Sequence, residues 1–493
     1  MKAFKPDDLV HSGLLKWAEA APHRVALSFN GKAISFAELA QHCALIGAAF
    51  ERRHARLIGV CLPNGATVIE VFFAALMAGG SACIFDPTWP PTVLKKLVQD
   101  HAPNVLIAPP KILQSLGDAL AKEQSLAPEE IKRIASKTGN ASVLKSEPTP
   151  DTPFLIGFTS GSSGTPKGFI RSHQTWVDSF RHSAIELGTH AGDIVMVPGP
   201  LSHGLSLYAA IEAISAGASV IIQSEFDALS VLDAITGHQA TVLVVVPAML
   251  DVLIGSADGK TYPSIDRIVT AGAKLSPQLR ANVKRTFSNA DTIEYYGASE
   301  LSFITVAKAS ELCPPGSVGR AFSGVEISLG DRQGGSVEAG EVGTIWVKSS
   351  MISSGYVGPT DGSGFRTDRP WATVGDLGHF DNQGFLYLDG REGSVITSAG
   401  YTVYPSAIEA ILREYSGVID VAVIGLPDSR WGEVIAAAIV LQQKTPESEQ
   451  RLADHCKCYL EPYACPRRWR FVKSLERTAS GKTNQSSLAK LFS

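Results

Sequence analysis

The chain has 493 residues, which exceeds the size of one hydrophobic core and predicts at least two domains. With 45% hydrophobic and 19% charged residues the composition is globular, which excludes a largely disordered protein. The formal net charge of -4 argues against nucleic acid as an obligate partner.

Neither a signal peptide nor a membrane span is predicted. Residues 1–15 carry two aspartates and a histidine, and they lack the basic and then apolar build of a signal peptide. The longest uncharged apolar run, 71–85, is interrupted by Gly-Gly-Ser and is too short to span a bilayer. We therefore expect a cytoplasmic protein, in which the cysteines stay reduced.

Helix and strand signals alternate through most of the chain. Strands are expected at 25–27, 57–62, 82–85, 194–197, 219–222, 242–246 and 268–269, with helical patterns between them. The polar stretch 109–150 predicts connecting surface helices. This alternation indicates an α/β fold with a doubly wound sheet, which binds its ligand at the strand ends.

The pattern changes in the last third of the chain. Short strands at turn-rich spacing predict a β-rich subdomain at about 316–389. Beyond it a compact α+β unit begins. We expect a large N-terminal domain of 1–391 and a small C-terminal domain of 392–493.

Four side chains of the C-terminal unit are of the kinds that bind zinc: His455, Cys456, Cys458 and Cys465. Their spacing is not a standard ligand spacing. The segment 451–460 is better interpreted as an amphipathic helix.

A loop rich in hydroxyls and glycines follows the predicted strand at 153–156. It reads Thr159, Ser160, Gly161, Ser162, Ser163, Gly164, Thr165, Pro166, Lys167, Gly168. Glycine lets backbone amides approach a polyphosphate closely, hydroxyls donate to its oxygens, and Lys167 offsets charge. The spacing is not that of a Walker loop. A flexible linker is the alternative, but linkers seldom end in Pro-Lys-Gly between apolar segments.

This loop closely resembles the signature of the adenylate-forming superfamily, which includes acyl-CoA synthetases, adenylation domains of peptide synthetases and firefly luciferase. Further motifs of the superfamily follow in the same order: Tyr295-Tyr296-Gly297-Ala298-Ser299-Glu300, Gly375-Asp376-Leu377-Gly378, Gly390-Arg391 and Arg477-Thr478-Ala479-Ser480-Gly481-Lys482. The resemblance covers nearly the whole chain, and it implies that 1–391 is an adenylation domain and that 392–493 is a mobile C-terminal domain.

The resemblance implies a role for each motif. Glu300 would hold the Mg2+ that accompanies ATP, and carboxylates suit that ion. Asp376 and Arg391 would bind the ribose, and Lys482 would stabilise charge on the transferred phosphoryl group. Adenine would be packed by Gly272, Ala273, Tyr295, Tyr296, Gly297 and Ser299, the last replacing a more usual Thr.

The C-terminal domain of the family swings between two half-reactions about a hinge. The hinge residue is usually Asp or Lys, but here it is Gly393, which absorbs backbone changes easily. The swing should remain possible, with either state held less firmly. Gly400 and Tyr401 lie in the segment that resembles the thioester-forming loop.

The segment 200–204 resembles the family's acyl-pocket segment, with Ser202 where an aromatic residue is common. His203 is either a catalytic residue or a core histidine. Amino-acid-activating members use an Asp near this point, and none occurs between Val197 and Leu207, so a buried ammonium would stay unpaired. The run 205–216 is mostly small and apolar, and we expect a fatty or aryl acid.

The predicted activity is an ATP-dependent ligase that forms an acyl-AMP and then a thioester with coenzyme A. The chain ends soon after Lys482 without an attached carrier domain, which favours coenzyme A over a separate carrier protein. The basic run Arg467, Arg468, Arg470 and Lys473 is either a coenzyme A contact or a solvated face. A non-catalytic nucleotide-binding protein is the remote alternative.

Overall fold

The computed structural model describes residues 5, 8–136, 147–159, 166–330, 337, 340–358, 364–392, 396–398, 401–428, 432–460, 462–477 and 483–492. They form two compact units. The first unit comprises residues 1–312, 321–325 and 348–363, and the second comprises 313–320, 326–347 and 364–493. The second unit thus groups the β-rich segment with the C-terminal residues, and the expected domain boundary at 391 stays a prediction.

The first unit contains two sheets whose central strands are parallel. One sheet runs in the order β18-β8-β7-β4-β3-β5-β6. Its strands are β3 (Leu57–Val60), β4 (Ser81–Ile84), β5 (Val105–Ile107), β6 (Ser125–Leu126), β7 (Pro153–Thr159), β8 (Lys167–Ser172) and β18 (Gly355–Tyr356). Strands β7 and β8 are antiparallel, as are β8 and β18.

The other sheet of this unit contains the order β14-β13-β12-β11-β9-β10-β1-β2. Its strands are β1 (Val25–Phe29), β2 (Lys32–Ser35), β9 (Ile194–Val197), β10 (Ser219–Ile222), β11 (Val242–Val245), β12 (Arg267–Thr270), β13 (Asp291–Ala298) and β14 (Ser302–Lys308), followed along the chain by β15 (Arg320–Ala321). All neighbours from β1 to β13 pair in parallel, while β2 and β14 are antiparallel edges.

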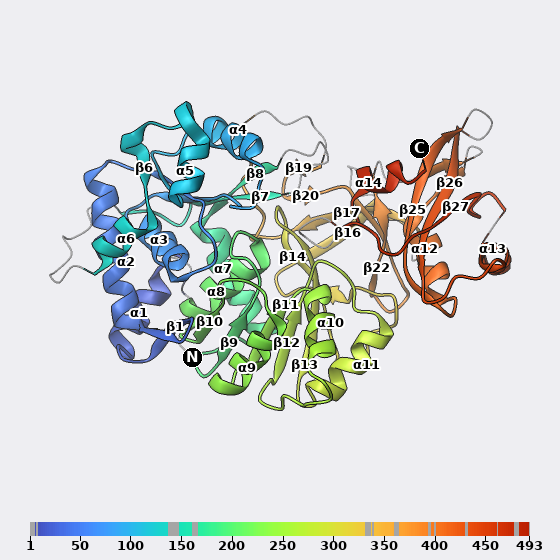
Figure 1. Ribbon diagram of the computed structural model, residues 1–493, viewed down its shortest axis with the longest axis horizontal. Helices are drawn as coiled ribbons and strands as arrows, with labels where there is room; N and C mark the ends of the chain where they lie inside the picture. Colours follow the sequence, from blue (N-terminus) through green and yellow to red (C-terminus); the bar gives the residue numbers. More distant parts are fainter. Residues whose placement is uncertain are drawn as a thin grey trace. The chain divides into compact units, whose positions relative to one another are not determined.

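Helices pack beside these sheets (Figure 1). They are α1 (Ser12–Ala20), α2 (Phe36–Arg52), α3 (Ala66–Met77), α4 (Pro91–His101), α5 (Pro110–Leu116), α6 (Pro128–Ala135), α7 (His173–Glu186), α8 (Gly204–Ala216), α9 (Ala228–His238), α10 (Pro247–Ser256) and α11 (Pro277–Thr286). Helix α8 contacts β9, β10 and β11, and it is apolar on nearly all sides. The predicted α/β fold is confirmed. The stretch 109–150 contributes a strand, β6, as well as the expected helices.

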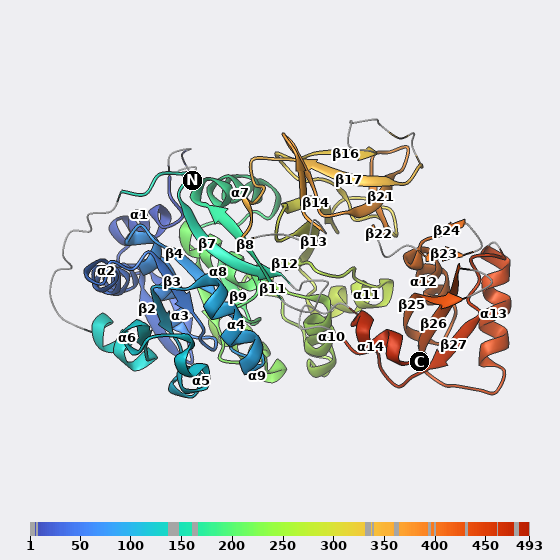
Figure 2. The same cartoon turned by 90° about the horizontal axis from the view of Figure 1, so that it is seen from above.

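The second unit has two further sheets (Figure 2). The first contains β16 (Glu326–Gly330), β17 (Gly343–Lys348), β19 (Arg366–Asp368), β20 (Trp371–Thr373), β21 (Asp376–Phe380) and β22 (Leu386–Arg391). The second contains β23 (Ile396–Ser398), β24 (Tyr401–Val403), β25 (Val418–Asp428), β26 (Gly432–Leu441) and β27 (Arg468–Phe471). Its helices are α12 (Pro405–Glu414), α13 (Ser448–Tyr459) and α14 (Gln485–Lys490), so the helix expected at 451–460 is present.

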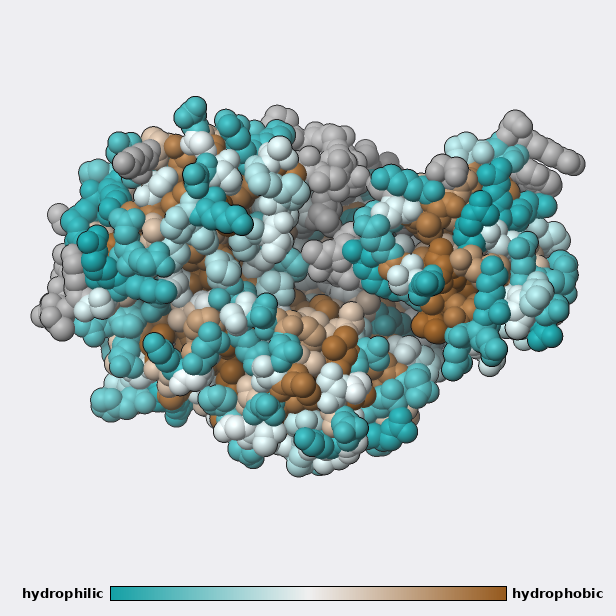
Figure 3. All heavy atoms as spheres, viewed as in Figure 1, coloured by the Kyte–Doolittle hydropathy of each residue, from teal (hydrophilic) through white to brown (hydrophobic). Residues whose placement is uncertain are grey.

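All seven cysteines are free thiols. Burial raises the pKa of Cys43 and Cys83 well above the usual thiol value and that of Cys61 to about 12. Cys458, on α13, is exposed. Within the described part of the chain, no helix has the length and apolar character that crossing a membrane requires. The face in Figure 3 is mostly hydrophilic, with apolar side chains in patches.

Candidate active site

The predicted phosphate loop connects two adjacent strands. Thr159 ends β7 and is the register partner of Lys167, which begins β8. An antiparallel ladder below the loop therefore holds its two ends side by side. The residues between them, Ser160, Gly161, Ser162, Ser163, Gly164 and Thr165, lie outside the described part of the chain.

A buried carboxylate lies near a buried guanidinium at the junction of the two sheets. Glu300 follows β13, and its Oε1 accepts a hydrogen bond from the Tyr356 hydroxyl at 2.5 Å. Arg171, in β8, donates to the backbone carbonyls of Ser299 and Met351. Burial lowers the pKa of Arg171 to about 10, and the charge of Glu300 opposes this shift. The pairing therefore limits the cost of burying either charge.

Arg171 and Tyr356 are site residues that the motif ending in Glu300 did not predict. Tyr356 belongs to β18, which pairs with β8 and places Tyr356 opposite Phe169. Phe169 is itself two residues beyond Lys167 in β8. The carboxylate expected to hold Mg2+ and the strand that leaves the phosphate loop are thus joined through β18.

The residues expected around adenine lie just after β12 and in or just after the C-terminal half of its neighbour β13. Gly272 and Ala273 follow β12, and β13 runs parallel to it with Thr270 opposite Glu294. Tyr295 and Tyr296 come next and point to opposite faces of the sheet. A Cβ on Gly297 would lie 2.2 Å from the carbonyl oxygen of Ser302, so that position requires glycine. Contact with adenine stays a prediction.

Asp376 and Arg391 are brought together in the second unit. They begin β21 and end β22, and they are register partners. Arg391 Nε lies 3.3 Å from Asp376 Oδ1, and the guanidinium also donates to the Val374 carbonyl at 3.0 and 3.2 Å. Gly375 precedes Asp376 with φ of +80°, a conformation that favours glycine. A ribose bound here would meet the preformed ion pair of Asp376 and Arg391.

His203 is the N-cap residue of helix α8. Its Nε2 lies 3.1 Å from Oδ2 of Asp86, which follows β4 in the other sheet of the same unit. Burial raises the pKa of Asp86, but the hydrogen bonds from His203 and from the Thr88 hydroxyl and amide outweigh it and lower the pKa to about 2. Asn64 holds the preceding loop through the Gly199 carbonyl and the Leu201 amide. His203 is therefore an oriented, half-buried group and not a core histidine.

A small cavity of about 20 Å³ lies beside α8, on the side that faces β9, β11, β12 and β13. Most of its lining is aliphatic, but Tyr208, Glu212 and Tyr295 also contribute. Burial raises the pKa of Glu212 to about 7, although a hydrogen bond from Ser183 and the charge of Arg267 oppose the shift. The run 205–216 is therefore not purely small and apolar. Its single glutamate, Glu212, was the sequence feature that could have indicated a polar group in the cavity.

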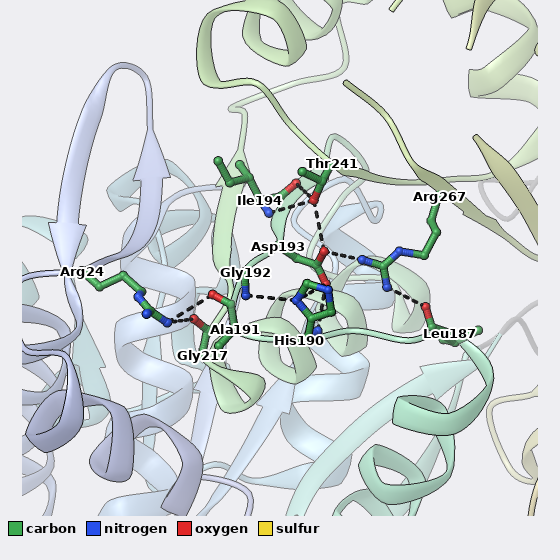
Figure 4. A network of polar contacts seen from close by, with 10 residues as sticks. All are labelled: Arg24, Leu187, His190, Ala191, Gly192, Asp193, Ile194, Gly217, Thr241 and Arg267. Atoms are coloured by element: carbon green, nitrogen blue, oxygen red, sulfur yellow. Dashed lines mark hydrogen bonds and ion pairs between the residues drawn. The ribbon is translucent and has the colours of Figure 1, made fainter. Parts of the chain in front are cut away.

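A network of polar contacts lies at the N-terminal ends of β9, β11 and β12, whereas the residues expected around adenine lie at the C-terminal ends of β12 and β13 (Figure 4). Asp193, just before β9, accepts from the His190 amide at 2.8 Å and from the Thr241 hydroxyl at 3.2 Å. It also pairs with Arg267, whose second nitrogen donates to the Leu187 carbonyl at 3.0 Å. Leu187 lines the cavity as well. The network thus joins three strands beneath the cavity.

The remaining predicted residues fall in the second unit. Lys482, Gly393 and Gly400 lie outside the described residues, and Tyr401 begins β24. Three arginines of the basic run and Lys473 are exposed, and Arg470 Nε donates to the Leu491 carbonyl at 2.9 Å. His455 Nε2 contacts the Ile411 carbonyl at 3.0 Å. Among the described residues, no group of three potential ligands could hold a metal ion.

Two family models match the chain. The model described as AMP-binding enzyme matches residues 14–357. The model described as AMP-binding enzyme C-terminal domain matches residues 407–482.

Similar proteins match over nearly their full lengths. The chain is 31% identical over 481 residues to the uncharacterized acyl–CoA ligase YhfT of Bacillus subtilis (strain 168), covering 96% of each protein. It is 27% identical to the 2-succinylbenzoate–CoA ligase of Oceanobacillus iheyensis, covering 97% of this chain and 98% of that one. The solved O-succinylbenzoate coenzyme A synthetase of Bacillus subtilis, in complex with ATP and magnesium ion, superposes with a TM-score of 0.85 at 24% identity, covering 98% and 100% of the chains.

Proposed function

Because the chain belongs to the AMP-binding enzyme family, and with it to the adenylate-forming superfamily, we propose that it activates an apolar carboxylic acid for transfer to coenzyme A. It is an AMP-forming acid–thiol ligase, and it uses ATP, Mg2+ and coenzyme A. The acid is the part of this proposal that depends on the residues of this chain.

The reaction has two steps. A carboxylate oxygen of the acid first attacks the α-phosphorus of ATP, and pyrophosphate leaves with the electron pair of the broken P–O bond. The thiol sulfur then attacks the acyl carbon, its proton is lost to a base or to water, and AMP leaves. Each step spreads negative charge over oxygens, so the protein accelerates it by presenting cations and N–H donors in fixed positions.

The observation that best supports the first step is the meeting of Glu300, Arg171 and Tyr356 beside the hairpin of the phosphate loop. Mg2+ takes one or two protein carboxylates together with phosphate oxygens, and a single buried carboxylate fits that requirement. Glu300 would hold the ion, which would neutralise charge on the phosphates. The Tyr356 hydroxyl orients the Glu300 carboxylate, and Arg171 places a positive charge near it.

A compact apolar acid is favoured by the surroundings of α8. The helix follows His203, and the cavity beside it has a mostly aliphatic lining with aromatic rings. No acidic residue occurs between Val197 and Leu207, so an α-ammonium group would lack a partner there. We therefore favour an aryl or short-chain acid over an amino acid, and an aryl over a long fatty acid.

The experiment that tests the function measures AMP and pyrophosphate with ATP and a panel of fatty acids, benzoates, arylalkanoates and amino acids, each with and without coenzyme A. Acid-dependent AMP release that turns over only with coenzyme A is expected. A single burst of pyrophosphate that coenzyme A cannot extend would identify a separate carrier protein as the acceptor. Absence of acid-dependent pyrophosphate would leave only a non-catalytic nucleotide-binding protein.

A further inference from the structure

Glu392 directly follows Arg391, one of the two residues expected to bind the ribose, and a different set of partners holds it. Its carboxylate pairs with the guanidinium of Arg366 through two contacts, Nη1 to Oε2 at 2.5 Å and Nη2 to Oε1 at 2.8 Å. The Thr344 hydroxyl donates to the same Oε1 at 2.6 Å. Arg366 lies in β19 and Thr344 in β17, so one glutamate joins two other strands of the sheet that contains β22.

The geometry of the Arg366–Glu392 pair fixes both side chains more firmly than an ordinary surface ion pair would. Exposed ion pairs contribute little to stability, but a two-point contact between an arginine and a carboxylate adds geometric specificity. The side chains of Arg366 and Glu392 are 29% and 34% exposed, so water screens the pair only in part. The hydrogen bond with Glu392 is also the main cause of the raised pKa of Arg366.

Glu392 also contacts the turn that presents Asp376. Its amide donates to the Gly375 carbonyl at 2.7 Å. A Cβ on Gly375 would lie 3.3 Å from Glu392 Oε2, so the carboxylate lies close against this glycine. Thr344 is the register partner of Leu377, the residue that follows Asp376. Glu392 and its partner Thr344 therefore lie beside the residues on both sides of Asp376.

Arg391 depends on the same turn. Its guanidinium donates to the Val374 carbonyl and lies 3.3 Å from Asp376. Its backbone is fixed on one side by β22 and on the other by Glu392. A displacement of Glu392 would therefore displace Arg391, and a misplacement of about 1 Å in a site can cost about a hundredfold in rate.

From these contacts we propose that Glu392 is a positioning residue, which holds Arg391 and Asp376 in the arrangement that binds the ribose of ATP. Glu392 acts through these two residues and not on the nucleotide itself. The inference rests on the proposed ligase function and on the ribose role expected for Asp376 and Arg391. The alternative that the test must separate is a purely structural role, in which the ion pair only stabilises the sheet.

The test measures the dissociation constants of ATP, 2′-deoxy-ATP and 3′-deoxy-ATP with Mg2+ by calorimetry, so that no acid substrate is needed. Wild type should bind ATP about tenfold to a hundredfold more tightly than either deoxynucleotide, the range for one hydrogen bond to a charged group. Glu392→Leu should reduce this preference to about threefold or less, because Asp376 and Arg391 lose their fixed positions. Arg366→Met, which removes the partner instead, should have the same effect.

The preference is a ratio within one enzyme preparation, so it does not change when a variant merely folds less well. Glu392→Gln keeps an acceptor for the Thr344 hydroxyl and should show an intermediate preference, which covers the case in which Glu392→Leu fails to fold. Glu409→Gln is the matched control, since Glu409 is another partly exposed glutamate of the second unit, paired with Arg413 at 3.1 Å. It should keep the wild-type preference.

Each outcome decides a different statement. A wild-type preference in the Glu392 and Arg366 variants would overturn the positioning role. An equal loss of affinity for all three nucleotides would also overturn it, because that result indicates a structural role. A wild-type enzyme that binds the three nucleotides equally would overturn the ribose site and this inference together, whereas acid-dependent pyrophosphate release decides the ligase function separately.

Discussion

At the scale of single residues, Glu300 and Arg171 show that a motif position and its partner can come from distant segments. Glu300 is 6% exposed, and its hydroxyl partner Tyr356 is 56 residues away in the sequence. A buried carboxylate keeps its charge only while such partners remain. The local sequence around Glu300 contains no sign of either partner.

Replacing Glu300 with glutamine should lower the rate of acyl-AMP formation by about a hundredfold, because the amide cannot neutralise a divalent cation at the phosphates. Pyrophosphate release measured at increasing Mg2+ concentrations checks this. Glu70→Gln, which changes another buried glutamate of the first unit, one that contacts His42, should keep the wild-type rate. A Glu300→Gln enzyme with a normal rate and a normal Mg2+ dependence would remove Glu300 from the site.

Residue roles could be predicted from sequence where a motif is contiguous, and not where the contact is between segments. Asp376 and Arg391 were expected together, and the β21–β22 register pairs them. Asp86 was not expected beside His203, because 117 residues separate them and only the folding of β4 near α8 joins them. Glu212 stood within an apolar run, and the sequence could not show that its side chain faces a cavity.

At the scale of elements, the N-terminal ends of α1 and α7 meet through two buried histidines. The rings of His11 and His173 lie 5.7 Å apart, and His173 Nδ1 accepts the Val10 amide at 3.2 Å. Burial lowers the pKa of His11 to about 4 and that of His173 to about 3. Both rings are thus neutral in the folded protein near pH 7.

The lowered pKa values predict acid sensitivity of folding. The contribution of each histidine is complete above pH 6.5, the unfolded value, and is lost as the pH falls toward the folded value. At pH 5 the loss is about 2 kcal/mol of unfolding free energy per histidine. Urea unfolding at pH 8 and pH 5 measures it.

His11→Leu should remove about half of this pH dependence, because it removes one of the two histidines that take up a proton when the protein unfolds. His54→Asn is the control, since His54 is exposed and its φ of +52° also suits asparagine. If the free energy of unfolding depends equally on pH in wild type and in His11→Leu, the two buried histidines do not cause the acid sensitivity.

The polar network of Figure 4 connects the ends of β9, β11 and β12, and Asp193 is its centre. Asp193→Asn should lower the unfolding free energy by about 3 kcal/mol, because it leaves the largely buried Arg267 without a charged partner. Asp100→Asn, which breaks an exposed ion pair with Lys96 on α4, should cost less than about 1 kcal/mol. Comparable losses in the two variants would contradict the role given to Asp193.

Elements with a strong period were predictable, and those defined by pairing were not. The strands at 194–197, 219–222 and 242–246 coincide with β9, β10 and β11 almost residue for residue, since buried parallel strands are continuous β-branched runs. The short strands β6 and β18 have two residues each and exist only because a neighbouring strand pairs with them. No periodicity can be read from two residues.

At the scale of the whole molecule, the alternation of helices and strands was enough to predict the α/β class, and the order of motifs was enough to predict the family. The extent of the compact units was not predictable, because it depends on contacts between segments such as 313–320 and 386, which the ladder of backbone hydrogen bonds joins. Chain order and spatial grouping therefore differ in the second unit.

The glycine at the expected hinge leads to a prediction about the balance of the two steps. Gly393→Asp restores the residue type that is common in the family and should change the ratio of the adenylation rate to the thioester-forming rate by about twofold or more, because glycine holds either backbone state less firmly. Rapid-quench measurement of acyl-AMP formation and of its reaction with coenzyme A gives the two rates. If both rates match wild type, the hinge glycine has no effect on the swing.

The distribution of thiols makes the second unit open to site-specific labelling. Cys43, Cys61 and Cys83 are buried with raised pKa values, and a maleimide reacts with exposed thiolates, so the exposed Cys458 on α13 should react first. With the partly exposed Cys313 and Cys465 changed to serine, a fluorophore or spin label would be confined to α13. The chain thus offers a natural attachment point from which motion of the C-terminal segment during turnover could be followed by spectroscopy.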